Sequence, residues 1–368
     1  MQTASSASIL QTVLLNASGP VGTSAGLLPL KVLARRARPA DCTVRGELPG
    51  AEEPLFLLPQ VSLVNTDPGE VTLTRRGVLE SKRWMEAQRA QAFKETRGLG
   101  DGDERNALYK EIRWCATKAE ELENHLERHF LPQHGLEQFL SPRVFFVSPL
   151  FGVRSRTQLR KKHVELELPT PHGKSAIQYM GPELRQSDGL VFLTLVHMLR
   201  DVQVGTAVTL QPKEVCMALF GRYDGNSRHQ LREHIQRLQQ GLLVFETFSV
   251  QMCLRFDYPK TGCWTVALDK KIIEIFRLSP ATWIALRGRL ALPDGLATWL
   301  YAYVCAQTRL IPMQLTTLCK LCGSDAGEKA FGNRFRAAMK LLATQGVIDT
   351  GWSVGNGEVR WRKPLKSQ

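Results

Sequence analysis

The pattern of hydrophobic and polar positions is most regular near the C-terminus, between Asp325 and Gly346. Apolar residues recur there at helical spacing on one stripe: Phe331, Phe335, Ala338 and Leu342. Polar and basic residues form the opposite stripe: Lys329, Asn333, Arg336 and Lys340. Glu328 follows Asp325 at capping-box spacing, and Gly346 suits the left-handed turn that ends a helix. The pattern predicts an amphipathic helix whose apolar face packs in a core and whose basic face can bind an anion. An ordinary solvated surface helix is the alternative.

The segment from 164 to 268 changes its hydrophobic period several times, which predicts alternating strands and helices. Asn226 is the expected N-cap of its longest helix, and Gly241 the residue at which that helix ends. The predicted helices are Ser187–Asp201, Pro212–Phe220 and Asn226–Gln240. The predicted strands are Val164–Leu168, Ala176–Met180, Val208–Leu210, Leu242–Phe248, Gln251–Tyr258 and Cys263–Leu268.

A similar order recurs in the last hundred residues. The predicted helices are Asp269–Phe276, Ala281–Leu290, Asp294–Gln307, Gln314–Cys322 and Asp325–Gly346, with an extended piece at Leu310–Met313. Strands at Val347–Trp352 and Gly357–Lys363 are expected to form a hairpin around Gly355-Asn356-Gly357, a strong signal for a tight turn. The junctions Gln240–Leu243 and Gln345–Ile348 are alike, each ending a helix and starting a hairpin.

A winged helix has the order helix, strand, helix, helix and hairpin. Because this order occurs twice in the chain, each copy supports the assignment of the other. We therefore predict an α+β fold with two tandem winged-helix domains, at 164–268 and 269–368. The third helix of each domain would enter the major groove of DNA, with the hairpin as a wing beside it.

The N-terminal part of the chain gives weaker signals. Residues 1–74 are predicted to be mostly disordered, because they are rich in Pro, Gly, Ser and Leu without lasting periodicity. No acidic residue precedes Asp41, which is typical of a transit peptide, but disorder or a start codon placed too early is the interpretation we prefer. Residues 75–131 predict a helical extension in two pieces, and 132–163 a linker with a basic run at Arg154–His163. This run could bind phosphates or simply lie in solvent.

Charge is distributed unevenly along the chain. The net charge is +13, but residues 1–140 hold 17 Lys and Arg against 18 Asp and Glu, whereas residues 141–368 hold 31 against 17. A basic excess confined to residues 141–368, which contain both predicted domains and the basic run, favours a polyanionic partner such as nucleic acid. A membrane is not expected as partner, since the sequence has no apolar run long enough to span one. Eight cysteines at irregular spacings indicate a reducing compartment, and we expect a cytoplasmic location in bacteria.

Two short motifs are candidates for chemistry. His172-Gly173-Lys174-Ser175 contains the end of a phosphate-binding loop, but Leu168 stands where the first Gly belongs and two prolines remove donors. Cys319-Lys320-Leu321-Cys322 is a CxxC without a second pair, so packing is the preferred interpretation over zinc or redox chemistry. A nucleotide-using or metal-dependent enzyme is a minor alternative. We expect no enzyme activity, no catalytic residue, no metal and no cofactor.

The candidate DNA-binding residues follow from the predicted winged helices. Arg and Gln suit bidentate contacts with guanine and adenine edges. Outward residues of the third helix in the first domain are Arg228, His229, Arg232 and Gln236, next to Gln240. Their counterparts in the second domain are Lys329, Asn333, Arg334, Arg336 and Lys340. Phosphate contacts are expected from the last strand: Arg360, Arg362 and Lys363, with Trp361 packing inward. Basic faces that are simply solvated remain the alternative.

Three collinear segments resemble one family. They are Ile177–Val191 (IQYMGPELRQSDGLV), Leu278-Ser279-Pro280 and Leu321–Asp325 (LCGSD), and they resemble the plasmid replication initiators of the TrfA family. The similarity runs from about Pro149 to Lys363. It implies two winged-helix domains that bind direct repeats (iterons) at a plasmid origin, help to open an adjacent AT-rich duplex, and recruit the host initiator and helicase.

The resemblance also implies a monomer–dimer equilibrium and binding of the host sliding clamp. The family's clamp-binding peptide reads Gln-Leu-Ser-Leu-Phe, and Gln60–Val64 matches it at Gln60, Ser62 and Leu63 but has Val64 in place of the aromatic residue. Residues 1–140 depart from the family. The alternative function is a winged-helix transcription regulator, which would bind an inverted repeat over a promoter.

Overall fold

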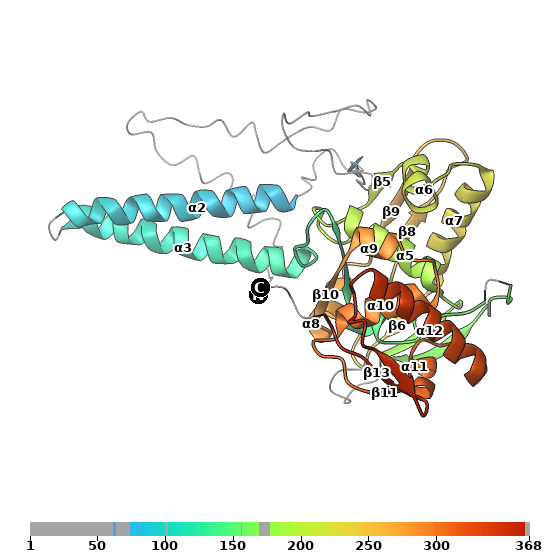
Figure 1. Cartoon of the computed structure of the whole chain (residues 1–368). Coiled ribbons are helices and arrows are strands. Elements are labelled where there is room, and N and C mark those ends of the chain that lie inside the picture. Colours follow the sequence, from blue (N-terminus) through green and yellow to red (C-terminus); the bar gives the residue numbers. More distant parts are fainter. Residues whose placement is uncertain (1–61, 64–73, 100–101, 156, 169–176, 365–368) are drawn as a thin grey trace. The chain divides into compact units, whose positions relative to one another are not determined.

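The computed structural model describes residues 62–63, 74–99, 102–155, 157–168 and 177–364 (Figure 1). Helices and strands are mixed, so the fold is α+β as predicted. The chain divides into two compact units. We call residues 74–128 the helical hairpin, and residues 129–364 with Ser62–Leu63 the main body. The predictions for the rest of residues 1–73, including Gln60, and for the motif at His172–Ser175 lie outside the described residues.

The helical hairpin consists of α2 (Arg75–Glu95), a short 3₁₀ turn η2 (Thr96–Gly98) and α3 (Asp103–His129). Thr74 caps α2, since its hydroxyl accepts a hydrogen bond from Gly77 N at 3.2 Å. Buried residues repeat every seven positions and form the seam: Val78, Met85 and Ala92 in α2, with Cys115 and Leu122 in α3. Lys82 and Glu123 form an ion pair between the helices. The prediction of two helical pieces is confirmed.

The first half of the main body contains α5 (Gln186–Met198), β5 (Val208–Leu210), α6 (Pro212–Phe220), α7 (Gly225–Gln240), β8 (Arg255–Asp257) and β9 (Trp264–Ala267). β9 lies between β5 and β8, and both pairs are antiparallel. β1 (Ser62–Leu63) pairs with the other edge of β5.

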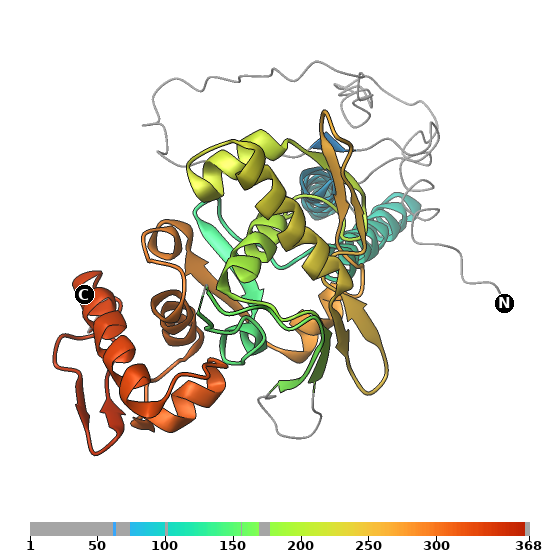
Figure 2. The same cartoon turned by 90° about the vertical axis from the view of Figure 1, so that its right-hand side faces the viewer.

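The second half repeats this order with α10 (Leu296–Ala306), β11 (Met313–Gln314), α11 (Leu315–Leu321), α12 (Glu328–Thr344), β12 (Ser353–Gly355) and β13 (Glu358–Arg360). Its sheet has the same strand order, because β13 lies between β11 and β12. The recurrence that the sequence predicted is thus present both in the elements and in their pairing. Figure 2 shows the first half in yellow-green to orange and the second in orange to red, next to each other.

Two further sheets complete the main body. One has the order β3 (Val164–Leu168), β4 (Ile177–Gly181), β6 (Leu242–Val244) and β7 (Ser249–Gln251). The other pairs β2 (Gln138–Pro142) with β10 (Ala281–Ala285). Three short helices flank β2 and β10 in the chain: α4 (Arg143–Phe146) follows β2, α8 (Ile272–Leu278) precedes β10, and α9 (Leu286–Leu290) follows β10.

The segment Pro132–Pro149 is not the predicted linker. It forms β2 and α4, whose apolar side chains are buried: Phe139, Leu140, Val144, Phe145 and Phe146. The helix predicted at Ala281–Leu290 is also wrong in its first half, which is strand β10. Thr282 and Ile284 are buried there while Trp283 is exposed, the two-residue period of a strand. The backbone N–H and C=O groups of each strand are paired with those of the other. Such long-range pairing cannot be predicted from the local sequence pattern. The predicted domain boundaries remain predictions.

Several ends of elements also differ from the predictions. The cap of α7 is Asp224 rather than Asn226, because the Asp224 carboxylate accepts from Ser227 N at 2.6 Å. Strand Leu242–Phe248 is split into β6 and a turn, and β6 joins β4 instead of starting the β8–β9 hairpin. Val347–Trp352 is not a strand, so the β12–β13 hairpin is shorter than predicted. The predicted strand Gln251–Tyr258 is strand only from Arg255, in β8, because Gln251 belongs to β7. The remaining predicted elements are present within a few residues of their expected ends.

Helix α5 belongs to both hydrophobic cores. Val191 and Leu195 lie in the core of the first half, and Leu193 in that of the second. At the start of α5, Gln186 donates to Phe151 O at 2.5 Å and accepts from the Thr298 hydroxyl of α10 at 3.2 Å. Helix α5 is therefore shared by the hydrophobic cores of both halves.

Candidate nucleic-acid interface

Helix α12 separates its apolar and basic residues as its sequence predicted. Phe331, Phe335 and Leu342 are buried in the second core. All five candidate residues on the other side are exposed: Lys329, Asn333, Arg334, Arg336 and Lys340. Among the described residues, none of these five side chains is held in a hydrogen bond or an ion pair. The face therefore presents cations and an amide with unused donors.

Both ends of α12 are fixed by the sequence. Gly346 has φ +67° just after the helix, the left-handed conformation predicted for it. The predicted N-cap, Asp325, is wrong, because α12 is capped at Gly327. The Asp325 carboxylate instead accepts from Gln158 at 2.7 Å and pairs with Arg154 at 2.8 Å, and these contacts lower its pKa. Part of the predicted basic run thus anchors the turn before α12.

The β12–β13 hairpin lies beside α12 in the second half. Asn356 and Gly357 at its tip have φ +50° and +75°, as a two-residue turn between right-twisted strands requires. Trp361 is buried and donates from its indole nitrogen to Ile311 O at 2.8 Å, so its neighbours Arg360 and Arg362 face outward. Arg360 pairs with Glu358 at 2.9 Å and Arg362 with Asp349 at 3.4 Å. Both side chains are about three-quarters exposed (76% and 74%).

Lys363 follows Arg362, beyond the end of β13, and is half-buried. The hairpin therefore offers two cations at its surface and a third nearby. Exposed cations on an extended ribbon can reach phosphates of a duplex without reading bases.

Helix α7 packs as predicted but presents its polar residues differently. Leu231, Ile235 and Leu238 are fully buried. Of the four candidates only His229 is exposed, whereas Arg228, Arg232 and Gln236 are half-buried.

The cause of this partial burial is the β8–β9 hairpin, which lies alongside α7. Arg228 donates to Pro259 O at 2.9 Å, and its guanidinium carbon lies 5.5 Å from the centre of the Trp264 ring. Arg232 stands 5.5 Å from the Tyr258 ring, and Gln236 donates to the Tyr258 hydroxyl at 2.8 Å. Nothing in the hydrophobic pattern of the helix predicted these contacts, since they depend on a hairpin more than twenty residues further along the chain.

A buried charge fixes α7 against α5. Asp188 is fully buried, and its carboxylate lies 2.8 Å from Arg237 Nε, 2.7 Å from His234 Nδ1 and 2.6 Å from Arg160 Nη1. It also accepts from the backbone nitrogen of Arg185 at 2.7 Å. Burial acts to raise the pKa of Asp188, but the hydrogen bond from His234 and the charges of Arg237 and Arg160 outweigh it and hold that pKa well below its usual value.

Sequence reasoning assigned Arg160 to a phosphate-binding or solvated run and gave Asp188 no role. The structure makes them partners in one ion pair, and Asp188 also pairs with Arg237, so this carboxylate joins three segments of the chain. Lys161 and Lys162, the next residues of the run, are exposed. These two exposed residues remain candidates for phosphate contacts.

Comparison with known families decides the relationship. The family model described as TrfA protein matches residues 138–360, more than half of the chain. The chain belongs to the TrfA family. This confirms the relationship to plasmid replication initiators that the resemblance indicated. The match begins in β2, inside the segment that the sequence predicts to be a linker. No curated protein matches the chain.

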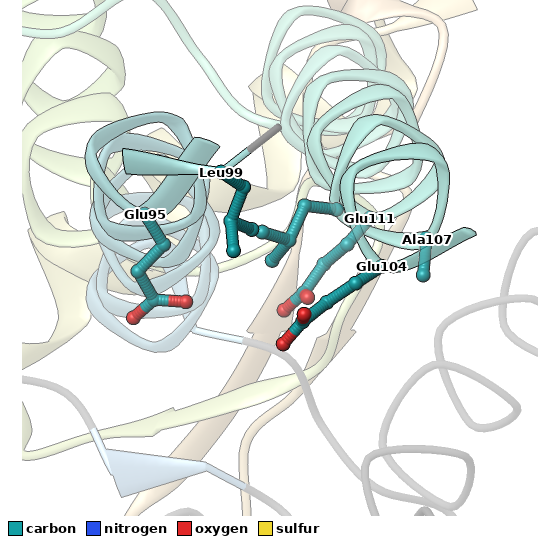
Figure 3. A pocket seen from close by; sticks show the side chains of 6 residues that line it. Glu95, Leu99, Glu104, Ala107 and Glu111 are labelled. Atoms are coloured by element: carbon teal, nitrogen blue, oxygen red, sulfur yellow. The ribbon is translucent and has the colours of Figure 1, made fainter. Parts of the chain in front are cut away.

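The part of the chain that matches the TrfA family contains both α7 and α12 with their neighbouring hairpins. The helical hairpin lies outside the match. A pocket near its turn is lined by three carboxylates and three apolar side chains, shown in Figure 3: Glu95, Glu104 and Glu111 with Leu99, Ala107 and Leu108. Three carboxylates repel phosphate, so this pocket does not extend the nucleic-acid interface.

The CxxC motif of this TrfA-family chain packs in the second core. Cys322 is fully buried, and burial raises its pKa to about 12. Burial also raises the pKa of Cys319, whose thiol donates to Ser324 O at 3.4 Å. Metal binding and disulfide exchange need a thiolate, which these surroundings disfavour. In the part of the chain that the structure describes, no group of three His, Cys, Asp or Glu side chains could hold a metal ion. No described helix is long and apolar enough to cross a bilayer.

Proposed function

We propose that this protein initiates plasmid replication by binding direct repeats in the plasmid origin through two winged-helix domains. Membership of the TrfA family and the repeated order of elements with the same strand order support this proposal. The observation that carries most weight is the exposed face of α12, where five polar or basic side chains stand together without partners among the described residues.

In the proposed complex, α7 and α12 enter successive stretches of major groove. Arg232, Gln236, Asn333 and Arg336 read base edges, because Arg matches guanine and the amides match adenine. Arg360, Arg362 and Lys363 bind phosphates and set the position of the second domain on the duplex. The remaining candidates support one or the other role: Arg228, His229, Lys329, Arg334 and Lys340. Bending of the duplex by two rigidly joined domains would then make separation of an adjacent AT-rich segment less costly.

The proposed role needs binding but no chemistry by this chain. The host initiator and helicase are the proposed partners, with a weaker case for the sliding clamp through Gln60 and Leu63. A monomer–dimer equilibrium and a cytoplasmic location belong to the same proposal.

Footprinting of the full-length protein on the origin region of its own plasmid tests the proposal. Protection of tandem direct repeats beside an AT-rich segment is the expected result. Protection of an inverted repeat over a promoter would instead support the transcription regulator. A uniform footprint without preference would refute both. The variant Lys329→Ala/Arg336→Ala should lose the footprint, and Arg76→Ala/Arg83→Ala, which removes two exposed cations from the helical hairpin, is the matched control.

A further inference from the structure

The β8–β9 hairpin carries an aromatic ladder that faces the polar side of α7. The Tyr258 and Phe256 rings are stacked at 4.9 Å, and Phe256 meets Trp264 edge-on at 5.4 Å. Phe256 and Trp264 are buried, whereas Tyr258 at the outer end is 41% exposed. The ladder therefore holds one tyrosine at the boundary between the core and solvent.

Three residues of α7 at successive turns meet this ladder. Arg228 lies over Trp264, Arg232 lies over Tyr258, and Gln236 donates to the Tyr258 hydroxyl. Tyr258 thus contacts both side chains to which the proposed function gives base readout in the first half. We propose that Tyr258 is a positioning residue that holds Arg232 and Gln236 in the conformation that reads DNA. This inference rests on the proposed function.

The type of contact favours positioning over sequestration. A guanidinium that lies over a ring is attracted through its charge, so this contact uses none of its N–H groups as hydrogen-bond donors. Arg232 Nη2 donates to His229 Nδ1 at 2.8 Å, and Arg232 Nε is buried without a hydrogen-bond partner. Within the described part of the chain, Nη1 makes no hydrogen bond. Donors of Arg232 are therefore available for a guanine edge.

The same reasoning applies to Gln236. A primary amide has two N–H donors and one oxygen acceptor, and the bond to Tyr258 uses one donor. The second donor and Oε1 remain, and these are the pair that recognises adenine. Without this contact, the side chains of Arg232 and Gln236 would lose rotamer freedom when they bind DNA, and this loss of entropy lowers affinity. Fixing them in advance reduces that loss.

The test is selection of sites from a randomised duplex library by the full-length protein, followed by titration of the selected duplex at several salt concentrations. Arg232→Ala and Gln236→Ala identify the base pairs that each residue reads. Tyr258→Ala should weaken binding about fivefold to tenfold, relax the preference at both sets of base pairs, and leave the salt dependence unchanged. Tyr258→Phe keeps the ring, so it should restore the preference that depends on Arg232 and leave the one that depends on Gln236 relaxed.

The matched control is Tyr109→Ala in the helical hairpin. Tyr109 is also 41% exposed and also lies beside an arginine, with Arg105 at 5.8 Å, so no change in binding is expected. Tyr258→Ala with wild-type preferences, or with tighter binding, would overturn the inference while leaving the proposed function intact. A loss of affinity equal for all sequences would also overturn it. If the wild-type protein selects no consensus, the proposed function fails and this inference with it.

Discussion

Replacement of Asp188 by Asn removes the charge at the centre of the contact between α5 and α7. An amide of the same shape cannot balance Arg237 and Arg160, whose side chains are only 16% and 26% exposed. Removing one partner of a buried ion pair leaves the other charge uncompensated, at a cost of roughly 3 to 5 kcal/mol. We expect Asp188→Asn to lower the free energy of unfolding at pH 7 by an amount in this range.

The measurement is urea unfolding followed by tryptophan fluorescence, since Trp264 and Trp299 are buried in the two cores of the main body. The control is Asp257→Asn. Asp257 also pairs with an arginine, Arg255, at 2.6 Å, but both side chains are about half exposed (53% and 51%). Exposed pairs contribute about 1 kcal/mol or less. Equal, small losses in the two variants would refute the importance assigned to the buried charge.

The dependence of stability on pH provides a second signature of Asp188. Its pKa in the folded protein is lowered, so its contribution is fully present above the unfolded pKa of about 3.9 and is lost as the pH falls towards the folded value. The wild-type protein should therefore lose stability more steeply than Asp188→Asn below about pH 4. Parallel pH profiles would contradict the lowered pKa.

Three other predictions concern α12 and its hairpin. Arg336→Ala should weaken binding of the specific site by about 1 to 3 kcal/mol in a gel-shift titration at fixed salt, and unchanged affinity would rule out base contact. Arg362→Ala should weaken binding to all duplexes and reduce the salt slope by about 1; a changed base preference with an unchanged slope would contradict this. Gly346→Ala should lower the free energy of unfolding by about 1 kcal/mol, because φ is +67° although a Cβ would meet nothing within 4 Å. Gly327→Ala is its control in urea unfolding, since a Cβ there also meets open space but φ is −58°.

The elements that the sequence predicted correctly are those encoded by residues close to one another in the chain. The apolar stripe and the Gly346 stop of α12, the Asn356-Gly357 turn and the Pro start of α6 all appear in the structure. Each depends on residues within a few positions of one another. This is why the order of elements in both halves could be predicted before their contacts were known.

The errors occurred where distant residues supply the partner. β2 and β10 are separated by more than a hundred residues, and neither strand is recognisable without the other. Asp325 has the spacing of a cap, but Arg154 and Gln158 compete for its carboxylate. Arg232 and Gln236 were expected to face solvent, and Tyr258 covers part of both. Helical periodicity gives the direction of a side chain and does not predict what covers it.

The shared helix α5 has a consequence for the shape of any target. Because one helix contributes to both cores, α7 and α12 are spaced by packed side chains rather than by a tether. A duplex read by both must present its two segments at one fixed rotation about its axis. An added base pair between the segments rotates one against the other by about 35°, since a turn of DNA holds about 10 base pairs. Under the proposed function the protein would therefore be sensitive to the helical phase between the two segments. A full extra turn would not be equivalent either, because the distance is fixed as well.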